Sequence, residues 1–113
     1  MSRGYPVKIT IVRKFSSEEV FGHEHYYPDG RKSTICPHFS EDEEIIIDHA
    51  YIDLPKDWPC SWAWMDLWKD LSVLSLGGDF SHTEPRVTYT TCRDGTKPVV
   101  FKLERIEEKV KKD

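Results

Sequence analysis

The sequence predicts an α+β domain in which a small antiparallel sheet carries one main helix. Two observations lead to this prediction. Four short segments alternate apolar with polar residues or are rich in β-branched residues, as strands are, whereas residues 60–76 place apolar residues at helical spacing. The expected element order is β-β-α-β-β. The whole chain, residues 1–113, should form a single domain, because chains this short rarely divide.

The first two expected strands lie before the helix. Residues 7–15 alternate apolar and polar side chains, which is typical of a half-buried strand. Residues 43–49 are a second short segment with consecutive isoleucines. Between them, residues 16–40 are rich in His, Tyr, Pro and Gly and contain a Pro-Asp-Gly turn, so we expect an irregular connection there.

The helix is expected over residues 60–76, close to all four tryptophans of the chain. The residues at helical spacing, which should face the sheet, are Trp64, Leu67, Leu71 and Leu74. Three other large side chains cannot all share that stripe: Trp62, Met65 and Trp68. At least one of these should therefore lie towards a pocket or a partner, and we expect a homodimer or larger homo-oligomer. Gly77 fits the left-handed position that follows a helix.

The last two expected strands, residues 86–92 and 98–106, form a hairpin around an Asp-Gly turn. Two registers compete, and a slip of one residue reverses every side chain. We favour the register that pairs Tyr89 with Phe101, because it collects the apolar side chains of both strands on one face. The residues that follow, about 107–113, form a charged tail.

The composition argues against several functional classes. Charged residues make up 32% of the chain and the formal net charge is −4, whereas a nucleic-acid-binding protein needs a basic surface. No apolar segment approaches the roughly 20 residues of a membrane-spanning helix. The first residues lack the apolar segment of a signal peptide, so we expect a cytoplasmic protein. An odd number of cysteines, three, indicates thiols or metal ligands rather than disulfides.

Cys60 is the candidate catalytic residue. The sequence places it in the first turn of the expected helix, where unpaired backbone N–H groups and the helix dipole stabilise a thiolate. The alternative is structural, because an unpaired cysteine between large aromatic residues is commonly a small buried side chain.

The three cysteines are also candidate metal ligands. Cys36, Cys60 and Cys92 each lie beside a turn or an element end, and His38 follows Cys36 closely. A second pair of imidazoles, His23 and His25, alternates on one side of an extended backbone. Together these residues make a divalent metal ion, zinc or iron, a candidate cofactor. The alternative for the histidines is a solvated polar loop.

Cationic and aromatic residues complete the candidate site. Lys97 and Arg105 could bind an anionic group, with Asp94 in the turn between the last two strands. Trp62 or Trp64 would supply an apolar wall. The competing interpretation of Lys97 and Arg105 is that they pair with nearby carboxylates, as surface charges commonly do.

Three segments, CPHF, PCSWAW and CRDGTKPVVFKLER, resemble the motifs of an uncharacterised family of small bacterial and archaeal proteins. The family pattern is C-P-x-F, then C-S-W-A-W, then C-x-D-G-x-R-P-V-x-F-x-x-x-R. The resemblance extends over residues 7–106, with Lys97 in place of the arginine of the last motif. It implies that the following residues lie on family motifs: Cys36, Cys60, Trp62, Trp64, Cys92, Asp94 and Arg105. It implies no established activity.

Two hypotheses from different classes therefore stand. The first is a thiol-lined pocket that binds a metal ion or a small anionic or aromatic ligand, and the sequence leaves open whether binding leads to catalysis. The second is a non-catalytic interaction domain whose exposed tryptophan face packs against a second copy or another protein.

Overall fold

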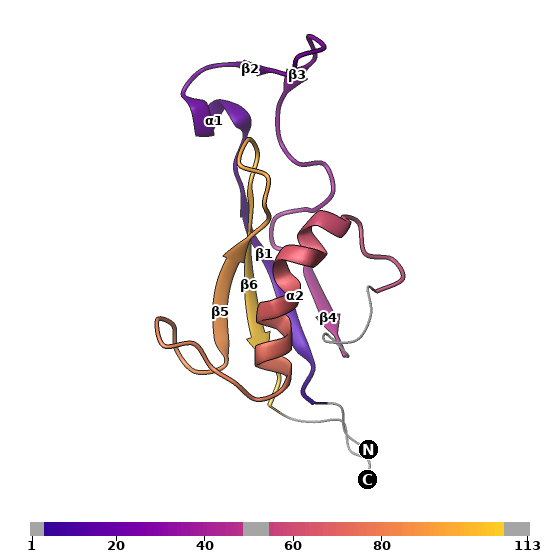
Figure 1. Ribbon diagram of the computed structural model, residues 1–113, viewed down its shortest axis with the longest axis vertical. Helices are drawn as coiled ribbons and strands as arrows, with labels where there is room; N and C mark the ends of the chain where they lie inside the picture. The colour runs from indigo at the N-terminus through magenta and orange to yellow at the C-terminus, as the bar shows by residue number, and fades with distance from the viewer. Residues whose placement is uncertain (1–3, 49–54, 108–113) are drawn as a thin grey trace.

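A four-stranded antiparallel sheet carries one long helix on its face in the computed structural model, which describes residues 4–48 and 55–107 (Figure 1). The strand order is β4-β1-β6-β5. The strands are β1 (Val7–Lys14), β4 (Glu44–Ile47), β5 (Val87–Thr91) and β6 (Val99–Arg105), and the helix is α2 (Ser61–Ser75). This architecture confirms the predicted α+β fold class. Of the expected charged tail, only Glu107 is among the described residues.

The centre of the sheet is the pair β1 and β6. Ile9 lies opposite Leu103 on β6 and Ile45 on β4, so one apolar row crosses three strands. Ile9 and Leu103 are fully buried, as the alternation of the sequence predicts. The register between β1 and β6 shifts after Ile11, and this bulge leaves Val12 exposed on the strand.

Helix α2 packs on this apolar row through the predicted stripe. The side chains buried beneath it are Trp64, Leu67, Leu71 and Leu74. Burying each of them contributes about 1.5–3 kcal/mol to folding. The helix ends as expected, because Gly77 has a φ of +98° just after the C-cap residue Leu76. No helix in the described part of the chain is both long and apolar enough to cross a membrane.

The predicted register of the last hairpin is wrong. Thr90, not Tyr89, lies opposite Phe101, and Tyr89 is about half exposed. The reason is the connecting loop, which is longer than the two or three residues expected. The backbone N–H of Thr96 binds the side chain of Asp94, and the strands pair again only where the N–H of Cys92 binds the carbonyl oxygen of Val99.

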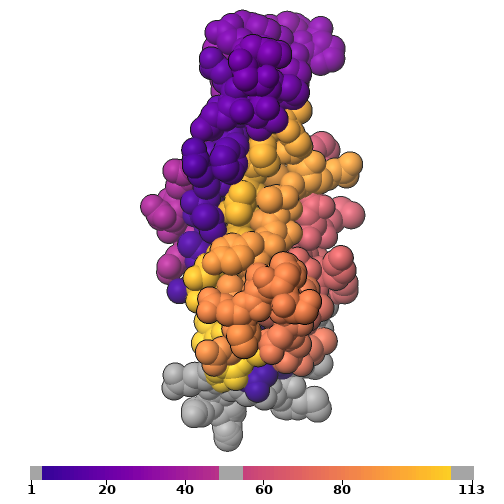
Figure 2. All heavy atoms as spheres, turned by 90° about the vertical axis from the view of Figure 1, so that its left-hand side faces the viewer, coloured from indigo at the N-terminus to yellow at the C-terminus, as the bar shows by residue number. Residues whose placement is uncertain are grey.

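Residues 16–35, expected to be irregular, contain three short elements: α1 (Ser17–Phe21), β2 (His25–Tyr26) and β3 (Lys32–Ser33). Helix α1 starts with a capping box, in which Ser16 and Glu19 bind each other's backbone N–H groups. Strands β2 and β3 form a hairpin around the Pro-Asp-Gly turn. These elements form a lobe at one end of an elongated molecule (Figure 2, indigo and violet).

Two buried serines attach this lobe to the main sheet. The hydroxyl of Ser17 lies 2.6 Å from that of Ser33 and donates to the carbonyl oxygen of Thr96 at 2.7 Å. Ser17 is fully buried, and its own N–H donates to Thr34. The lobe is therefore bound to the loop between β5 and β6, which also borders the candidate site.

Candidate functional site

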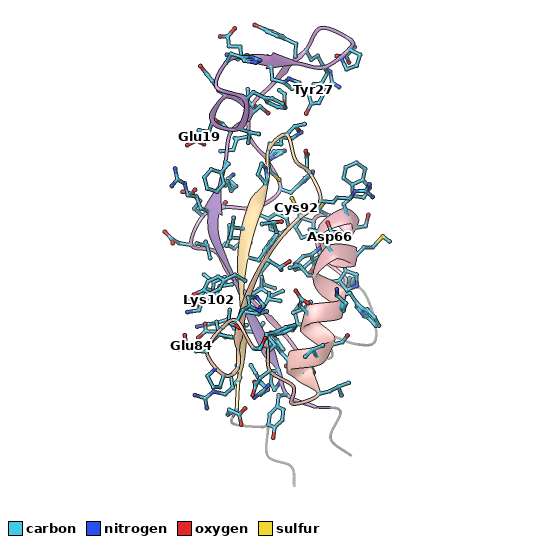
Figure 3. The ribbon with its side chains drawn as sticks, turned by 60° about the vertical axis from the view of Figure 1, so that its left-hand side comes forward. Glu19, Tyr27, Asp66, Glu84, Cys92 and Lys102 are labelled. Carbon is cyan, nitrogen blue, oxygen red and sulfur yellow. The ribbon has the colours of Figure 1, made fainter. Side chains whose placement is uncertain are left out.

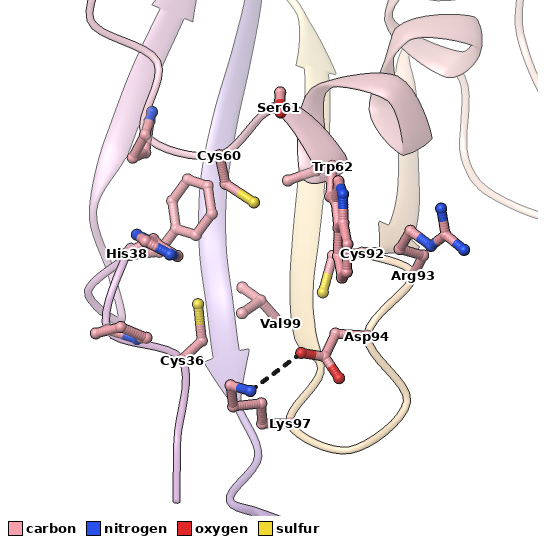
Figure 4. Close-up of a pocket in the computed structure, with 14 residues that line it drawn as sticks. Cys36, His38, Cys60, Ser61, Trp62, Cys92, Arg93, Asp94, Lys97 and Val99 are labelled. Atoms are coloured by element: carbon pink, nitrogen blue, oxygen red, sulfur yellow. Dashed lines mark ion pairs between the residues drawn. The ribbon is translucent and has the colours of Figure 1, made fainter. Parts of the chain in front are cut away.

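A cavity of about 410 Å³ lies where the start of α2, residues 36–39 and the loop between β5 and β6 meet. All three cysteines of the chain line it, together with other residues that can bind or react: His38, Trp62, Arg93, Asp94 and Lys97. Figure 4 shows the sulfur atoms of Cys36, Cys60 and Cys92 directed into the cavity from three different segments. The fold thus brings together thiols that are far apart in the sequence.

Cys60 is not inside the first turn of α2, as the sequence predicts, but is itself the N-cap residue. Its backbone is extended, with φ −148° and ψ 110°, and its carbonyl oxygen accepts the first helical hydrogen bond from Trp64. The indole N–H of Trp58 donates to the same oxygen at 2.6 Å, so the turn before the helix is fixed from both sides. The partly exposed thiol of Cys60 therefore lies at the N-terminus of the helix rather than on its side.

No side chain caps the start of α2 within the described residues. The thiol of Cys60 makes no capping hydrogen bond, and the N–H groups of residues 61–63 have no acceptor in the part of the chain that the structure describes. All three of these residues line the cavity. The positive end of the helix dipole therefore lies beside the cavity, an arrangement that favours an anion.

Cys36 and Cys92 reach the cavity from opposite sides. Cys36 lies in the connection between β3 and β4 and is only 9% exposed. The ammonium group of Lys14 donates to its carbonyl oxygen at 2.9 Å. Cys92 follows the end of β5 and is held by the backbone hydrogen bond to Val99. Its thiol is partly exposed, as that of Cys60 is.

Lys97 supplies a positive charge to the cavity wall. Its ammonium group pairs with Asp94 at 3.3 Å (Figure 4, dashed line) and donates a hydrogen bond to the hydroxyl of Tyr27. The hydrogen bond to Tyr27 raises the pKa of Lys97, burial opposes this, and the Asp94 carboxylate adds to the increase. Burial raises the pKa of Asp94, but the hydrogen bonds from Thr96 and the charge of Lys97 outweigh burial and lower it. The pair is therefore held in its charged form.

Arg93 is a second cation beside the cavity, which the sequence did not predict, and Figure 4 shows its side chain beyond Trp62, pointing away from the three thiols. Its guanidinium group lies 5.0 Å from the ring centre of Trp62, as in a cation–π contact. Its backbone N–H donates to the carboxylate of Asp66 on α2, which joins the loop to the helix beside Cys92 (Figure 3). The only sequence signal was the position of Arg93 directly after Cys92 and before the Asp-Gly turn. Tyr27 was also missed, because nothing local relates it to a lysine 70 residues away.

The structure does not bring His23 and His25 into the cavity. Both lie in the lobe of residues 16–35, where the ring of His25 stacks on Phe21 with the ring centres 4.1 Å apart. His23 approaches the carbonyl oxygen of Glu24 at 2.8 Å. His38 is the only predicted histidine among the described residues that line the cavity.

Trp64 and Arg105 were also assigned to the site and lie elsewhere. Trp64 is 7% exposed in the core, where its ring meets that of Trp58 edge-on. Arg105 lies at the far end of β6, and each residue of a strand adds about 3.3 Å. It cannot be the anion partner of this cavity, because it binds the carboxyl end of α2 instead.

At the C-terminal end of α2, Arg105 binds backbone carbonyl groups. Its guanidinium group donates to the carbonyl oxygen of Gly78 at 2.7 Å and to that of Leu74 at 3.3 Å. It also pairs with Asp79 and Glu107. With its side chain only 6% exposed, Arg105 has a structural role that follows from the negative end of the helix dipole.

The metal ligands expected from the sequence do not form a recognisable centre. Within residues 4–48 and 55–107, no three His, Cys, Asp or Glu side chains are grouped so that they could hold a metal ion. The thiols share a cavity, but they do not share one coordination point in this arrangement.

A scan of protein-family models and searches of curated proteins and of solved structures found no match to this chain. The basis for its function is therefore the chemistry of the cavity.

Proposed function

We propose that the cavity binds a small anionic ligand and that the thiol of Cys60 is the reactive group facing it. The observation that carries this proposal is the convergence of three thiols and Lys97 on one cavity at the uncapped start of a 15-residue helix. An aromatic part of such a ligand would contact Trp62, whose side chain is 55% exposed at the edge of the cavity.

The charges of the cavity favour an anion. Two cations, Arg93 and Lys97, line it with one carboxylate, Asp94, so their sum is +1. The guanidinium of Arg93 lies against the ring of Trp62, so it adds positive charge beside the cavity rather than inside it. The N–H groups at the start of α2 add a partial positive charge. The same features stabilise a thiolate at Cys60, the form in which a thiol is a nucleophile.

The test is the charge preference of alkylation at Cys60. Iodoacetate is anionic and iodoacetamide is its neutral analogue, so the ratio of their rates reports the local potential independently of intrinsic thiol reactivity. We expect this ratio, measured for each cysteine by peptide mass spectrometry, to be several-fold higher at Cys60 than in the unfolded chain. Arg93→Gln and Lys97→Gln should lower it.

Lys102→Gln is the matched control. Lys102 also belongs to the hairpin of β5 and β6, but it pairs with Glu104 and does not line the cavity. Its loss removes the same charge from the protein and should leave the ratio at Cys60 unchanged. An equal effect of all three substitutions would show that only net charge matters, and would contradict an anion site.

A divalent metal ion is a less favoured occupant. Zinc or iron bound by Cys36, Cys60, Cys92 and His38 would require these groups to move together on binding. Elemental analysis of the purified protein distinguishes the two: stoichiometric zinc or iron that slows alkylation of all three cysteines would support the metal, and its absence supports the anionic ligand.

The exposed face of α2 favours a second function, self-association. Its large apolar side chains outside the core are Trp62, Met65, Trp68 and Leu76, each at least 42% exposed. We propose a homodimer through this face as the non-catalytic alternative. Sedimentation of wild type and of Met65→Glu/Trp68→Glu tests it: a dimer that the substitutions dissociate supports the interface, and a monomeric wild type at high concentration contradicts it.

The proposed thiol chemistry is suited to the cytoplasm, the compartment we propose for the protein. Thiols stay reduced there, whereas secreted proteins oxidise them. All three cysteines are free in the structure, as this proposal requires. With its acidic net charge of −4, the chain offers nucleic acid little attraction, so the proposed partner is a small molecule.

A further inference from the structure

We infer that the cavity performs thiol–disulfide exchange on small anionic disulfides, with Cys60 as the attacking thiol and Cys36 as the resolving thiol. This inference rests on the proposed anion site and specifies its substrate class. It is drawn from the number, exposure and anchoring of the cysteines, since one thiol is enough for ligand binding but two are needed to complete the exchange.

Cys60 is placed to attack first. Its thiol is partly exposed in the cavity, which the start of α2 and Lys97 also border. Cys36 cannot meet a bulky disulfide directly, because it is only 9% exposed. Its sulfur nevertheless points into the same cavity (Figure 4).

Cys36 is the better placed of the two remaining thiols to approach Cys60. It lies in the loop between β3 and β4, outside any strand pairing, so a local shift of its backbone breaks no sheet hydrogen bond, only the side-chain bond from Lys14. Cys92 is less mobile, because its N–H is bonded to Val99 and the next residue is bonded to Asp66 on α2.

The chemistry balances in two steps. The thiolate of Cys60 attacks one sulfur of the substrate RSSR, forms a mixed disulfide Cys60–S–S–R and expels RS⁻. The thiolate of Cys36, after losing its proton to solvent, attacks the Cys60 sulfur, forms the Cys36–Cys60 disulfide and expels the second RS⁻. The substrate is reduced by two electrons, and the protein dithiol is oxidised by two.

Dithiobis(2-nitrobenzoate), an anionic aromatic disulfide, is the probe that tests this inference. One equivalent added to the reduced protein should release two equivalents of coloured thionitrobenzoate, and the product should have lost two hydrogen atoms and carry no adduct. Cys36→Ser should release only one equivalent and retain the adduct on Cys60. Cys60→Ser should react several-fold more slowly, with the adduct on Cys92.

Cys92→Ser identifies the resolving thiol. It should still release two equivalents and close the Cys36–Cys60 disulfide, which peptide mapping detects. If an intramolecular disulfide fails to form in Cys92→Ser but still forms in Cys36→Ser, Cys92 is the resolving thiol and the assignment of Cys36 is overturned. An adduct retained by the wild type would overturn the exchange itself.

The neutral analogue dithiodipyridine separates this inference from the proposed function. If the wild type keeps an adduct but still reacts faster with the anionic reagent than with the neutral one, relative to the unfolded chain, the exchange fails and the anion site stands. If that preference is absent as well, both are contradicted.

Discussion

The ammonium group of Lys97 donates a hydrogen bond to the hydroxyl of Tyr27, which lies 70 positions earlier in the chain. Tyr27 is in the turn between β2 and β3 (Figure 3), whereas Lys97 lines the cavity (Figure 4). The same ammonium group lies 5.0 Å from the centre of the tyrosine ring. The lobe of residues 16–35 thus helps to hold the cation that faces the proposed ligand.

The ionisation of Tyr27 should report this contact. The hydrogen bond from Lys97 lowers the pKa of Tyr27 below its ordinary value of 10.0, because the positive charge stabilises the tyrosinate. In an alkaline titration followed by tyrosinate absorbance, we expect one tyrosine of the wild type to ionise early. Lys97→Met should return that tyrosine to its ordinary range. Tyr27→Phe should remove the early step altogether, and an early step that persists in Tyr27→Phe would assign it to another residue.

Asp94 should contribute to stability in a pH-dependent manner. Its pKa is lowered in the folded protein, so its contribution is present above its ordinary value of 3.8 and is lost as the pH falls through the lower folded value. Urea unfolding of wild type and Asp94→Asn should therefore differ most near neutral pH and converge in acid. Asp57→Asn, which removes the same charge from an exposed carboxylate with no partner among the described residues, is the control.

Loss of Arg105 should destabilise the fold without affecting the cavity. Arg105→Gln removes a nearly buried charge from the carbonyl groups of Leu74 and Gly78, and we expect a loss of about 2–3 kcal/mol in the free energy of unfolding. Its partner Glu107 is 43% exposed, so Glu107→Gln should cost at most about 1 kcal/mol. Alkylation of Cys60 in folded Arg105→Gln should match the wild type. Slower alkylation would show that the two ends of α2 are coupled.

Substitutions on the buried and exposed faces of α2 should lower the free energy of unfolding by very different amounts. Leu67 is fully buried, and Leu67→Ala should reduce the free energy of unfolding by about 2–5 kcal/mol through lost burial and a cavity. Met65, two residues earlier, is 73% exposed, and Met65→Ala should change stability by less than about 0.5 kcal/mol in the monomer. A large concentration-dependent loss in Met65→Ala would instead indicate that this face is buried in a dimer.

The parts of the fold that sequence predicts well are those determined by local pattern. The alternation around Ile9 and the helical spacing of Leu67 and Leu71 each require one buried face, and the structure buries them. The hairpin register depended on a loop closed by the side chain of Asp94, which hydrophobic pattern alone does not reveal. Helix α1 was readable from its capping box, Ser16 and Glu19, but its single turn of apolar residues is too short for a periodicity argument.

The candidate site was predictable only in part. A helix start and a strand end can meet at one edge of a small domain, and this placed Cys60 and Cys92 together. Arg105 shared a motif with Cys92, but an extended strand carries residues of one motif to opposite ends of the molecule. Arg93 and Tyr27 act through contacts across the fold, and no spacing in the sequence encodes them.

Because the cavity is assembled from three segments that meet only in the native state, whatever occupies it must bind the folded chain in preference to the unfolded one. Occupancy then raises the melting temperature, and the increase grows with the logarithm of ligand concentration once the site is saturated. A thermal-shift screen of small carboxylates, phosphates and sulfonates would therefore rank natural occupants without any assumption about turnover. The uncapped first turn of α2 gives each hit a structural signature: a bound anion completes the helix, so protection of its earliest amides from hydrogen exchange should rise in step with the melting temperature.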